Sequence, residues 1–366
     1  MYLVTNRALD SSRRGLNKFL STSGQEGALN LRIVEIAGTR RNPTVAVLDD
    51  QLSAAAVRRL NRQHDLNLDP EVPQYQSVAV ACELFARARA ERKHILFYVH
   101  GYNNDVSAVV DAARELEANY PELIVVPFSW PAKGGGSLSG TANYLDDKRD
   151  ARASSGALDR VFGIVRRLHL LLTEAESRRL WTRTLEKYPD NPERAREHYV
   201  ALQSRVCRVT LNLLCHSMGN YVLKYAAIPS ETNIRRPVFD NVCLVAADCN
   251  NHDHVPWLGE IDCRGGVYVV INEDDYALRW SRIKPGEEQQ RRLGHYLKNL
   301  AAPNAIYVDL TRAPGVGESH GYFKGEVIRN SAKLRRFFNR LFTGEHPERY
   351  VSQLKFDAGS NAYRLK

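Results

Sequence analysis

Short and almost continuous runs of apolar residues recur along the chain from about residue 94. Six of them are rich in Val, Ile, Leu and Tyr: HILFYVHG (94–101), LIVVPFSW (123–130), VTLNLLCHS (209–217), NVCLVAAD (241–248), GGVYVVINED (265–274) and AIYVDL (305–310). Runs without polar alternation are typical of strands that are buried on both faces of a parallel sheet. The pattern therefore predicts that these six runs are strands of one mostly parallel sheet.

Segments with helical periodicity lie between these runs. DVSAVVDAARELEANY (105–120) has Asp105 in a position to cap its first turn and Pro121 just beyond its end. ALDRVFGIVRRLHLLL (157–172) and GNYVLKYAAI (219–228) show the same periodicity. Alternation of strands and helices favours right-handed crossovers. The sequence thus predicts a doubly wound α/β fold.

The first ninety residues are less regular. LRIVEIAG (31–38) and TVAVLDD (44–50) indicate two strands that could form an antiparallel edge, and AVACELFARARAERK (79–93) indicates a helix. We expect residues 1–93 to be an N-terminal extension packed on the sheet edge. Residues 94–330 are expected to form the core, and residues 331–366 a C-terminal helix and tail.

Two segments interrupt the alternation. PAKGGGSLSGTANYLDDKRD (131–150) is predicted to be a long loop, and long loops in compact domains are usually functional or mobile. TEAESRRLWTRTLEKYPDNPERAREHYVALQSR (173–205) is charged and helix-prone, with Tyr188-Pro189 in its middle. It indicates an inserted helical hairpin, either as a solvated decoration or as a lid over a substrate.

The composition is that of an ordinary globular protein, with 43% hydrophobic and 25% charged residues in 366. The formal net charge is +9, but the basic residues are spread along the chain as pairs. A nucleic-acid-binding surface needs Lys and Arg gathered on one face, so we expect no nucleic-acid partner. The positive charge favours at most a weak attraction to an anionic membrane surface or an acidic partner.

The cysteines and the termini indicate a cytoplasmic protein. The six cysteines contain no C-x-x-C pair: Cys82, Cys207, Cys215, Cys243, Cys249 and Cys263. Scattered thiols in apolar runs are typical of a reducing compartment. The N-terminus has no continuous apolar region of the signal-peptide kind, and no stretch of 18 apolar residues occurs. We therefore expect neither a leader nor a transmembrane segment.

The run LLCHSMGNYV (213–222) passes from a strand-like pattern to a helix-like one at Ser217. A reactive serine on such a turn needs a small residue two positions later, where the helix passes close to the strand, and Gly219 meets that need. CHSMG therefore resembles the G-x-S-x-G nucleophile elbow of α/β-hydrolases, with Cys215 in place of the first glycine. The alternative is that Ser217 only caps the following helix.

A catalytic serine needs a base, and the base needs an acid to orient it. In the α/β-hydrolase fold the chain order is Ser, then Asp or Glu, then His. Acidic residues end two later strands, at Asp248 and at Asp274-Asp275, and a Gly-rich loop after the last predicted strand carries His320. His252 and His254 precede the later strands and are less suitable as the base.

The strand at 94–101 ends in an HG pair, which α/β-hydrolases often place before a second oxyanion donor. The expected donors are the backbone N–H groups of Tyr102 and Met218. His100, Trp130 and His216 are candidates for substrate contact. Core packing is the alternative for the aromatic side chains, including that of Tyr144.

A polar stretch, NHDH (251–254), invites a metal-site interpretation. No further cluster at ligand spacing supports a metal there, so we expect no metal and no other cofactor.

The whole set of motifs resembles a bacterial branch of the α/β-hydrolase superfamily that is known mainly as a domain of unknown function. The likeness covers roughly residues 94–325 and the opening LVTNR, and rests on YVHGYNN, PFSWPAKG, YLDDKRDARASSGAL, LLCHSMGN, DDYAL and SHGYF. The resemblance implies a triad of Ser217 as nucleophile, His320 as base and Asp275 as acid. Asp274 is the neighbour of this acid, and Asp248 is the competing choice.

The activity implied is that of a serine hydrolase, which cleaves an ester-like acyl bond in a small molecule through an acyl-enzyme. A carboxylesterase acting on a short acyl ester is the default, and a lipase, a thioesterase or an acyltransferase would use the same triad. The alternative from another class is a non-catalytic module of the same fold that binds a ligand or partner.

Overall fold

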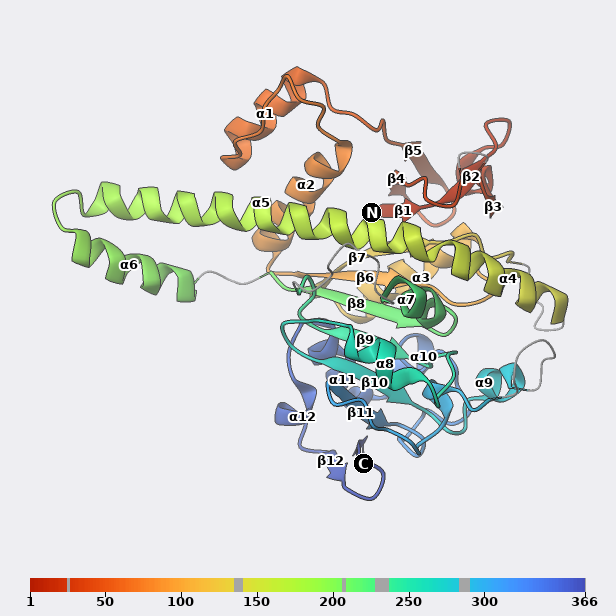
Figure 1. Ribbon diagram of the computed structural model, residues 1–366. Coiled ribbons are helices and arrows are strands. Elements are labelled where there is room, and N and C mark those ends of the chain that lie inside the picture. The colour runs from red at the N-terminus through yellow and green to blue at the C-terminus, as the bar shows by residue number, and fades with distance from the viewer. Residues whose placement is uncertain (25–26, 135–140, 206–208, 228–236, 283–289, 366) are drawn as a thin grey trace. The chain divides into compact units, whose positions relative to one another are not determined.

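The computed structural model describes residues 1–24, 27–134, 141–205, 209–227, 237–282 and 290–365. The chain forms two compact units (Figure 1). The sheet unit comprises residues 1–47, 94–161 and 210–366, and the helical unit comprises residues 48–93 and 162–209. This grouping differs from the expected division, because residues 48–93 belong with the helical insertion, and only residues 1–47 join the sheet.

The sheet unit contains an eleven-stranded sheet within the described part of the chain, in the order β12-β13-β11-β10-β9-β8-β6-β7-β1-β4-β5 (Figure 1). Its strands are β1 (Tyr2–Thr5), β4 (Arg32–Gly38), β5 (Pro43–Val47), β6 (His94–Val99), β7 (Leu123–Ser129), β8 (Leu211–His216), β9 (Val242–Val245), β10 (Val267–Ile271), β11 (Ala305–Asp309), β12 (Leu354–Asp357) and β13 (Ala362–Leu365). Neighbours from β1 through β13 in this order pair parallel. The edge pairs β1–β4, β4–β5 and β12–β13 are antiparallel.

The six predicted strands are confirmed as β6 to β11, at the centre of this sheet. Every residue of β7, β8, β9 and β10 is buried, as the continuous apolar runs predicted. The predicted antiparallel pair is also confirmed, as β4 and β5, whose exposed and covered residues alternate. The doubly wound, mostly parallel α/β fold is therefore the observed one.

Three strands of the sheet were not predicted. β1 joins the antiparallel edge to the parallel centre, because it pairs parallel with β7 and antiparallel with β4. β12 and β13 form from the segment that was expected to be a tail, and β13 pairs with β11. Unlike β9, which also has four residues but lies in a longer apolar run, none of the three lies in an apolar run of more than four residues. A separate two-stranded sheet pairs β2 (Arg7–Leu9) with β3 (Phe19–Ser23).

The helices are α1 (Ala54–His64), α2 (Gln76–Glu91), α3 (Val106–Asn119), α4 (Thr141–Ala153), α5 (Ser155–Lys187), α6 (Pro192–Arg205), α7 (Gly219–Ala227), α8 (His254–Gly259), α9 (Tyr276–Ser281), α10 (Gly325–Asn330), α11 (Ala332–Phe342) and α12 (Pro347–Tyr350), with 3₁₀ turns at Gly15–Lys18 and Leu293–His295. The predicted helices are present, and the structure adds α1, α4, α8, α9, α10 and α12, which were not predicted. Asp105 caps α3 as predicted, because its carboxylate accepts a hydrogen bond from the N–H of Ala108. Within the described residues, no helix is both long and apolar enough to cross a membrane.

The predicted loop at 131–150 is wrong over its second half, where α4 begins at residue 141; residues 135–140 lie outside the described residues. The predicted helix at 157–172 continues through the expected start of the insertion, so that α5 reaches Lys187. The predicted hairpin at 173–205 is present, with its first arm made by α5 and its turn at the Tyr188-Pro189 pair.

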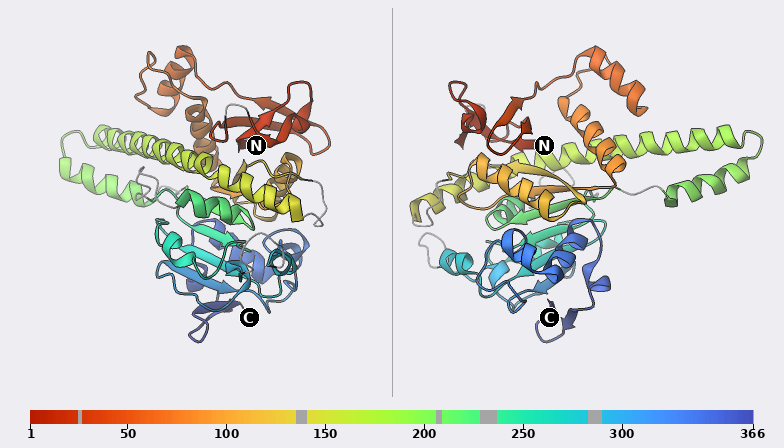
Figure 2. Two further views of the ribbon diagram at one scale, coloured as in Figure 1. Left: turned by 45° about the vertical axis from the view of Figure 1, so that its right-hand side comes forward. Right: turned by 180° about the vertical axis from the view of Figure 1, so that it is seen from behind.

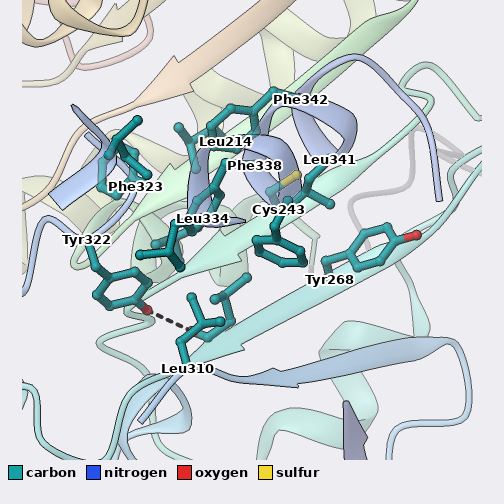
Figure 3. Close-up of a cluster of buried hydrophobic side chains, with 14 of the residues drawn as sticks. Leu214, Cys243, Tyr268, Leu310, Tyr322, Phe323, Leu334, Phe338, Leu341 and Phe342 are labelled. Atoms are coloured by element: carbon teal, nitrogen blue, oxygen red, sulfur yellow. Dashed lines mark hydrogen bonds between the residues drawn. The ribbon is translucent and has the colours of Figure 1, made fainter. Parts of the chain in front are cut away.

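Helices cover both faces of the sheet. α3, α10 and α11 lie on one face, seen from behind in Figure 2, and α7 and α8 lie on the other (Figure 1). The core on the first face is built around the aromatic side chains of α11, which pack on residues of β8, β9 and β10 (Figure 3). Phe337, Phe338 and Phe342 are fully buried there. This packing holds the central strands in place and makes their ends a rigid platform.

The helical unit has a separate core. Leu60 of α1, Val78 and Cys82 of α2 and Leu172 of α5 belong to one buried cluster. α6 folds back along α5 (Figure 1), and the rings of Trp181 and Tyr199 meet edge to face at 5.5 Å between their centroids. The unit is therefore stabilised by its own side chains.

Candidate active site

The strand order reverses at β6. From β6 the chain proceeds to β7 on one side, and it later returns to β8 on the other side of β6. In open α/β sheets, ligands bind in the crevice at the carboxyl ends of the strands that flank such a reversal. The residues that follow these two strands are His100 and Gly101 after β6, and Ser217 after β8. The sheet therefore brings two of the predicted motifs to one point.

The backbone of Ser217 is in the left-handed region, with φ = 52°. This conformation costs an L-residue other than glycine about 1–2 kcal/mol. An ordinary N-cap serine has an extended backbone, so simple capping does not explain the geometry. Strain of this kind is typical of a nucleophile elbow, where a sharp turn lifts the hydroxyl above the sheet.

Two glycines let the chain pass close to this turn. A Cβ atom on Gly219 would lie 2.6 Å from the carbonyl oxygen of Val99 and 2.7 Å from that of His100. A Cβ atom on Gly101 would lie 2.8 Å from the Cβ of Ser217. The need for a small residue at position 219 is thus confirmed, and Gly101 meets the same need from the side of β6. Cys215, in place of the first glycine of the motif, is accommodated as a buried free thiol.

Asn220 stabilises the turn, and sequence reasoning gave it no role. Its fully buried side-chain amide donates to the carbonyl oxygens of Cys215 and Ser217 at 3.0 Å each, and lies 3.3 Å from that of Val245. These contacts hold the end of β8 to the end of β9. The only signal in the sequence is the position of this amide directly after the elbow glycine.

His320 and Asp275 are hydrogen-bonded partners. The Nδ1 atom of His320 lies 2.7 Å from Oδ2 of Asp275, whose side chain is fully buried, whereas the imidazole is 21% exposed. The other carboxylate oxygen of Asp275 accepts hydrogen bonds from the N–H groups of Ala277 and Leu278 at the start of α9. Asp275 is therefore both a helix cap and the residue that holds the Nδ1 edge of the His320 imidazole.

The loop that carries His320 is anchored on both sides. The side-chain amide of Asn272 donates to the carbonyl oxygens of Gly317 and Ser319, at 2.9 and 3.2 Å. On the other side, Tyr322 is fully buried, donates to the carbonyl oxygen of Val270 at 3.0 Å and accepts from the N–H of Ala246 (Figure 3). Tyr322 of the SHGYF stretch thus fixes the loop that carries His320 to β10 and β9. The sequence did not indicate Asn272.

Ser217 and His320 line one cavity of about 560 Å³. The other lining residues come from the ends of neighbouring strands and from α4 and α9: Gly101, Tyr102, Asn103, Asn104, Tyr144, His216, Asp248, Tyr276, Ala277, Leu278, Trp280 and Ser281. The rings of His216 and His320 have centroids 4.6 Å apart, and Nε2 of His216 lies 3.1 Å from the carbonyl oxygen of His320. Burial, and then the neighbouring His320, hold the pKa of His216 well below its usual value, so this imidazole is neutral.

The two other candidate acids lie in different surroundings. Asp248 pairs with the guanidinium of Arg292 at 3.1 Å and accepts from Ser281 at 2.8 Å and from Tyr144 at 2.9 Å. Burial acts to raise the pKa of this carboxyl, but the charges of Arg292 and Lys148 and the hydrogen bonds from Ser281 and Tyr144 together outweigh it, and the net pKa is lowered. Asp274 is exposed. Of the three carboxylates, the one that contacts His320 is therefore Asp275.

His100 and Trp130 do not line the cavity, contrary to the expectation that they contact substrate. Both are fully buried, and their rings stack with centroids 4.9 Å apart. The N–H of Trp130 donates to Nε2 of His100, and Nδ1 lies 2.8 Å from the carbonyl oxygen of Gly101. Burial lowers the pKa of His100 to about 3, so the neutral ring donates through Nδ1. These side chains therefore support the loop after β6 and do not reach the cavity wall.

The two expected oxyanion donors differ in their surroundings. Tyr102 lies on the cavity wall, in the loop after β6. Met218 is fully buried between Ser217 and the first residue of α7. Both backbone N–H groups thus belong to residues beside Ser217, one at the end of each strand that flanks the reversal.

The polar stretch at 251–254 is occupied by internal contacts. His254 is fully buried, and its Nε2 lies 2.6 Å from the hydroxyl of Tyr307. Asp253 pairs with Lys224 at 2.6 Å. Over the residues that the structure describes, no group of three or more His, Cys, Asp or Glu side chains could hold a metal ion.

Residues 79–171 match the model of a family described as "Alpha/beta hydrolase of unknown function (DUF900)". The matched segment includes β6, α3, β7 and α4, and ends before Ser217, Asp275 and His320. Searches of curated proteins and of solved structures each found no match. The strand order is consistent with an α/β-hydrolase fold, and residues 79–171 are similar to a family of α/β-hydrolases whose function is unknown.

Proposed function

We propose that the protein is a serine hydrolase that cleaves an ester-like bond with Ser217 as nucleophile, His320 as base and Asp275 as the acid that orients it. One observation carries the proposal: a buried carboxylate lies 2.7 Å from Nδ1 of an imidazole that shares a cavity with a serine in strained backbone geometry. A serine used only for capping needs neither the strain nor the cavity.

The reaction follows from these roles. The Oγ atom of Ser217 forms a bond to the acyl carbon while its proton passes to Nε2 of His320, and the carbonyl electrons move to oxygen. The tetrahedral intermediate collapses, the bond from carbon to the leaving oxygen breaks, and Nε2 returns the proton to that oxygen. Water then repeats the sequence on the acyl-enzyme, with His320 again as base, and releases the acid.

The proposed oxyanion donors are the N–H groups of Tyr102 and Met218. In known enzymes, removal of one such donor lowers kcat by about 10²–10³-fold. Both residues lie next to Ser217, and the N-terminal end of α7 adds a favourable dipole.

The cavity favours a small acyl ester. Its volume of about 560 Å³ is within the range of small-molecule sites. Tyr276 and Trp280 of α9 line it and are 37% and 60% exposed, so they offer an apolar surface to the substrate. We therefore propose short acyl esters as substrates, with the polar wall of Tyr144, Ser281 and Asp248 beside the reacting group.

A fluorophosphonate probe tests the proposal, together with p-nitrophenyl esters of increasing chain length. We expect the wild-type protein to be labelled and to hydrolyse the shorter esters, and Ser217→Ala to do neither. Equal labelling of both proteins would remove the role of this serine. If the wild-type protein neither reacts with the probe nor hydrolyses any ester, a non-catalytic ligand-binding module becomes the better interpretation.

A further inference from the structure

Residues 101–104, here called the oxyanion loop, connect β6 to α3 and line the cavity beside Ser217. The loop includes Asn103, whose backbone is left-handed with φ = 58°. The side-chain amide of Asn104 donates to the carbonyl oxygens of Gly101 and Tyr102, at 3.2 and 2.8 Å. A loop in this conformation needs external support to keep one geometry.

Arg7 provides support from one side. Its guanidinium donates to the carbonyl oxygen of Asn104 at 2.7 Å, to the hydroxyl of Ser129 at 2.9 Å and to the carbonyl oxygen of Ala132 at 2.9 Å. The side chain is almost completely buried. The guanidinium thus ties the oxyanion loop to the segment after β7, at the same end of the sheet.

The sheet explains how Arg7 reaches this point. β1 pairs parallel with β7, with Thr5 opposite Ser129, and Arg7 follows two residues after β1. The hydroxyl of Thr5 donates to the carbonyl oxygen of Ser129 at 2.7 Å and accepts from the N–H of Arg7 at 3.1 Å. The hydrogen bonds of Thr5 therefore fix the direction in which the chain leaves β1 at Arg7.

Asp147 of α4 provides support from the other side. Its carboxylate accepts from the N–H of Asn103 at 3.1 Å and from the N–H of Lys133 at 2.9 Å, and it is fully buried. Burial raises the pKa of this carboxyl, while the two N–H groups act to lower it. A buried carboxylate used in this way contributes to the position of the loop, because each N–H donates along a defined direction.

We propose that Arg7 and Asp147 form an ionic clamp whose function is to position the oxyanion loop, and with it the backbone N–H of Tyr102, for catalysis. Asp147 holds the N–H of the peptide unit between Tyr102 and Asn103, and Arg7 holds the carbonyl of the unit between Asn104 and Asp105. The two residues thus fix the peptide units on either side of the one between Asn103 and Asn104. Since a trans peptide is planar, holding the N–H of Asn103 also fixes the direction of the Tyr102 carbonyl, and the unit that carries the N–H of Tyr102 directly precedes this one. Both are positioning residues, and the inference rests on the proposed function of Ser217.

The test uses Arg7→Met, Arg7→Lys and Asp147→Asn, each measured per active site after titration with the fluorophosphonate. We expect kcat for the best p-nitrophenyl ester to fall about tenfold to a hundredfold in Asp147→Asn, less than for complete loss of a donor, with KM changed less than threefold. The inhibition constant of a trifluoromethyl ketone, whose tetrahedral adduct carries the oxyanion, should rise in the same proportion. Arg7→Lys should lie between Arg7→Met and wild type, because one ammonium cannot reach all the acceptors.

The control variants are Arg264→Met and Asp240→Asn. These residues form a two-point ion pair with contacts of 2.8 and 3.0 Å, next to the start of β9 and thus at the opposite end of the strands. Both substitutions should reduce stability without a contact to the oxyanion loop. They should therefore leave kcat per active site and the inhibition constant of the trifluoromethyl ketone unchanged. The double variant Arg7→Met/Asp147→Asn should lose less than the product of the two single effects, because both act on one loop.

The possible outcomes separate the two proposals. Unchanged kcat in the clamp variants, or reduced kcat with an unchanged ketone constant, would overturn the clamp while the serine hydrolase stands. If the wild-type protein is inactive, the proposed function fails, and the clamp is then judged by amide hydrogen exchange. Faster exchange of residues 101–104 in Asp147→Asn but not in Asp240→Asn supports the clamp, and equal exchange overturns it.

Discussion

At the scale of single residues, one carboxylate of the candidate site makes two kinds of contact. Asp275 caps α9 with one carboxylate oxygen and contacts His320 with the other. Asp248 also lines the cavity, yet its carboxylate is committed to Arg292, Ser281 and Tyr144. Two buried carboxylates near one cavity thus have separate partners, and substitution can tell them apart.

We expect Asp275→Asn to lower kcat by about 10⁴-fold, because the amide would favour the wrong tautomer of His320. Asp248→Asn should lower it by less than tenfold, while reducing stability by about 3–5 kcal/mol, since it leaves Arg292 buried without its counter-charge. Ester hydrolysis and urea unfolding measure the two effects. If Asp248→Asn abolished turnover and Asp275→Asn did not, the proposed triad would be incorrect.

At the scale of elements, the elbow depends on how closely α7 approaches the end of β6. The backbone oxygens of Val99 and His100 occupy the space where a side chain of residue 219 would begin. A side chain at residue 219 would push α7 outward. Ser217 would then move too, because only Met218 lies between Ser217 and the first residue of α7. The packing of α7 against the end of β6 therefore determines where the hydroxyl of Ser217 lies.

Gly219→Ala should shift α7 and lower the rate of fluorophosphonate labelling at least tenfold, with a loss of about 1–3 kcal/mol in stability from overpacking. Gly163→Ala is the matched control, because a Cβ there meets no atom within 4 Å and the residue lies inside α5. That change should raise stability by about 0.5–1 kcal/mol and leave labelling unchanged. Normal labelling of Gly219→Ala would show that the turn tolerates the shift.

At the scale of the whole molecule, the buried ionisable groups of the sheet unit favour neutral to weakly alkaline pH. His100 and His216 are buried, and their pKa values are depressed, so both are neutral in the folded protein. In the unfolded chain they would protonate below pH about 6.5. The unfolded state therefore binds protons that the folded state does not, and the free energy of unfolding falls as the pH falls below about 6.5. The contribution of His100 to this fall ends at about pH 3, where the folded protein also binds the proton. Asp248, with a lowered pKa, adds a further loss at lower pH.

We expect the free energy of unfolding to fall by about 1.4 kcal/mol for each of these two histidines between pH 7.5 and 5.5. Urea titrations followed by tryptophan fluorescence would measure it. A His100→Asn variant should be less stable at pH 7.5 but should lose about 1.4 kcal/mol of this pH dependence. A wild-type stability that is flat over this range would contradict neutral, buried imidazoles.

The sequence by itself determined the central strands, the helices α2, α3, α5, α6, α7 and α11, and the identity of the strongest candidates. Continuous apolar runs indicate strands that are buried on both faces, and Ser217 followed by Gly219 indicates a tight turn. Both features can be recognised from the sequence because each depends on neighbouring residues only. The same locality explains the failures. β1, β12 and β13 lack the longer apolar run that reveals β9, and the division into two units joins segments far apart in the chain.

Only the tertiary structure decided which side chains meet. Asp275 rather than Asp248 contacts His320, and His100 and Trp130 stack on each other in the interior rather than on the cavity wall. Arg7 and Asp147 converge on the oxyanion loop from positions 140 residues apart. The physical reason is that hydrogen bonds depend on distances of about 3 Å and on direction, which are set by strand order and helix packing and leave no periodic trace in the chain.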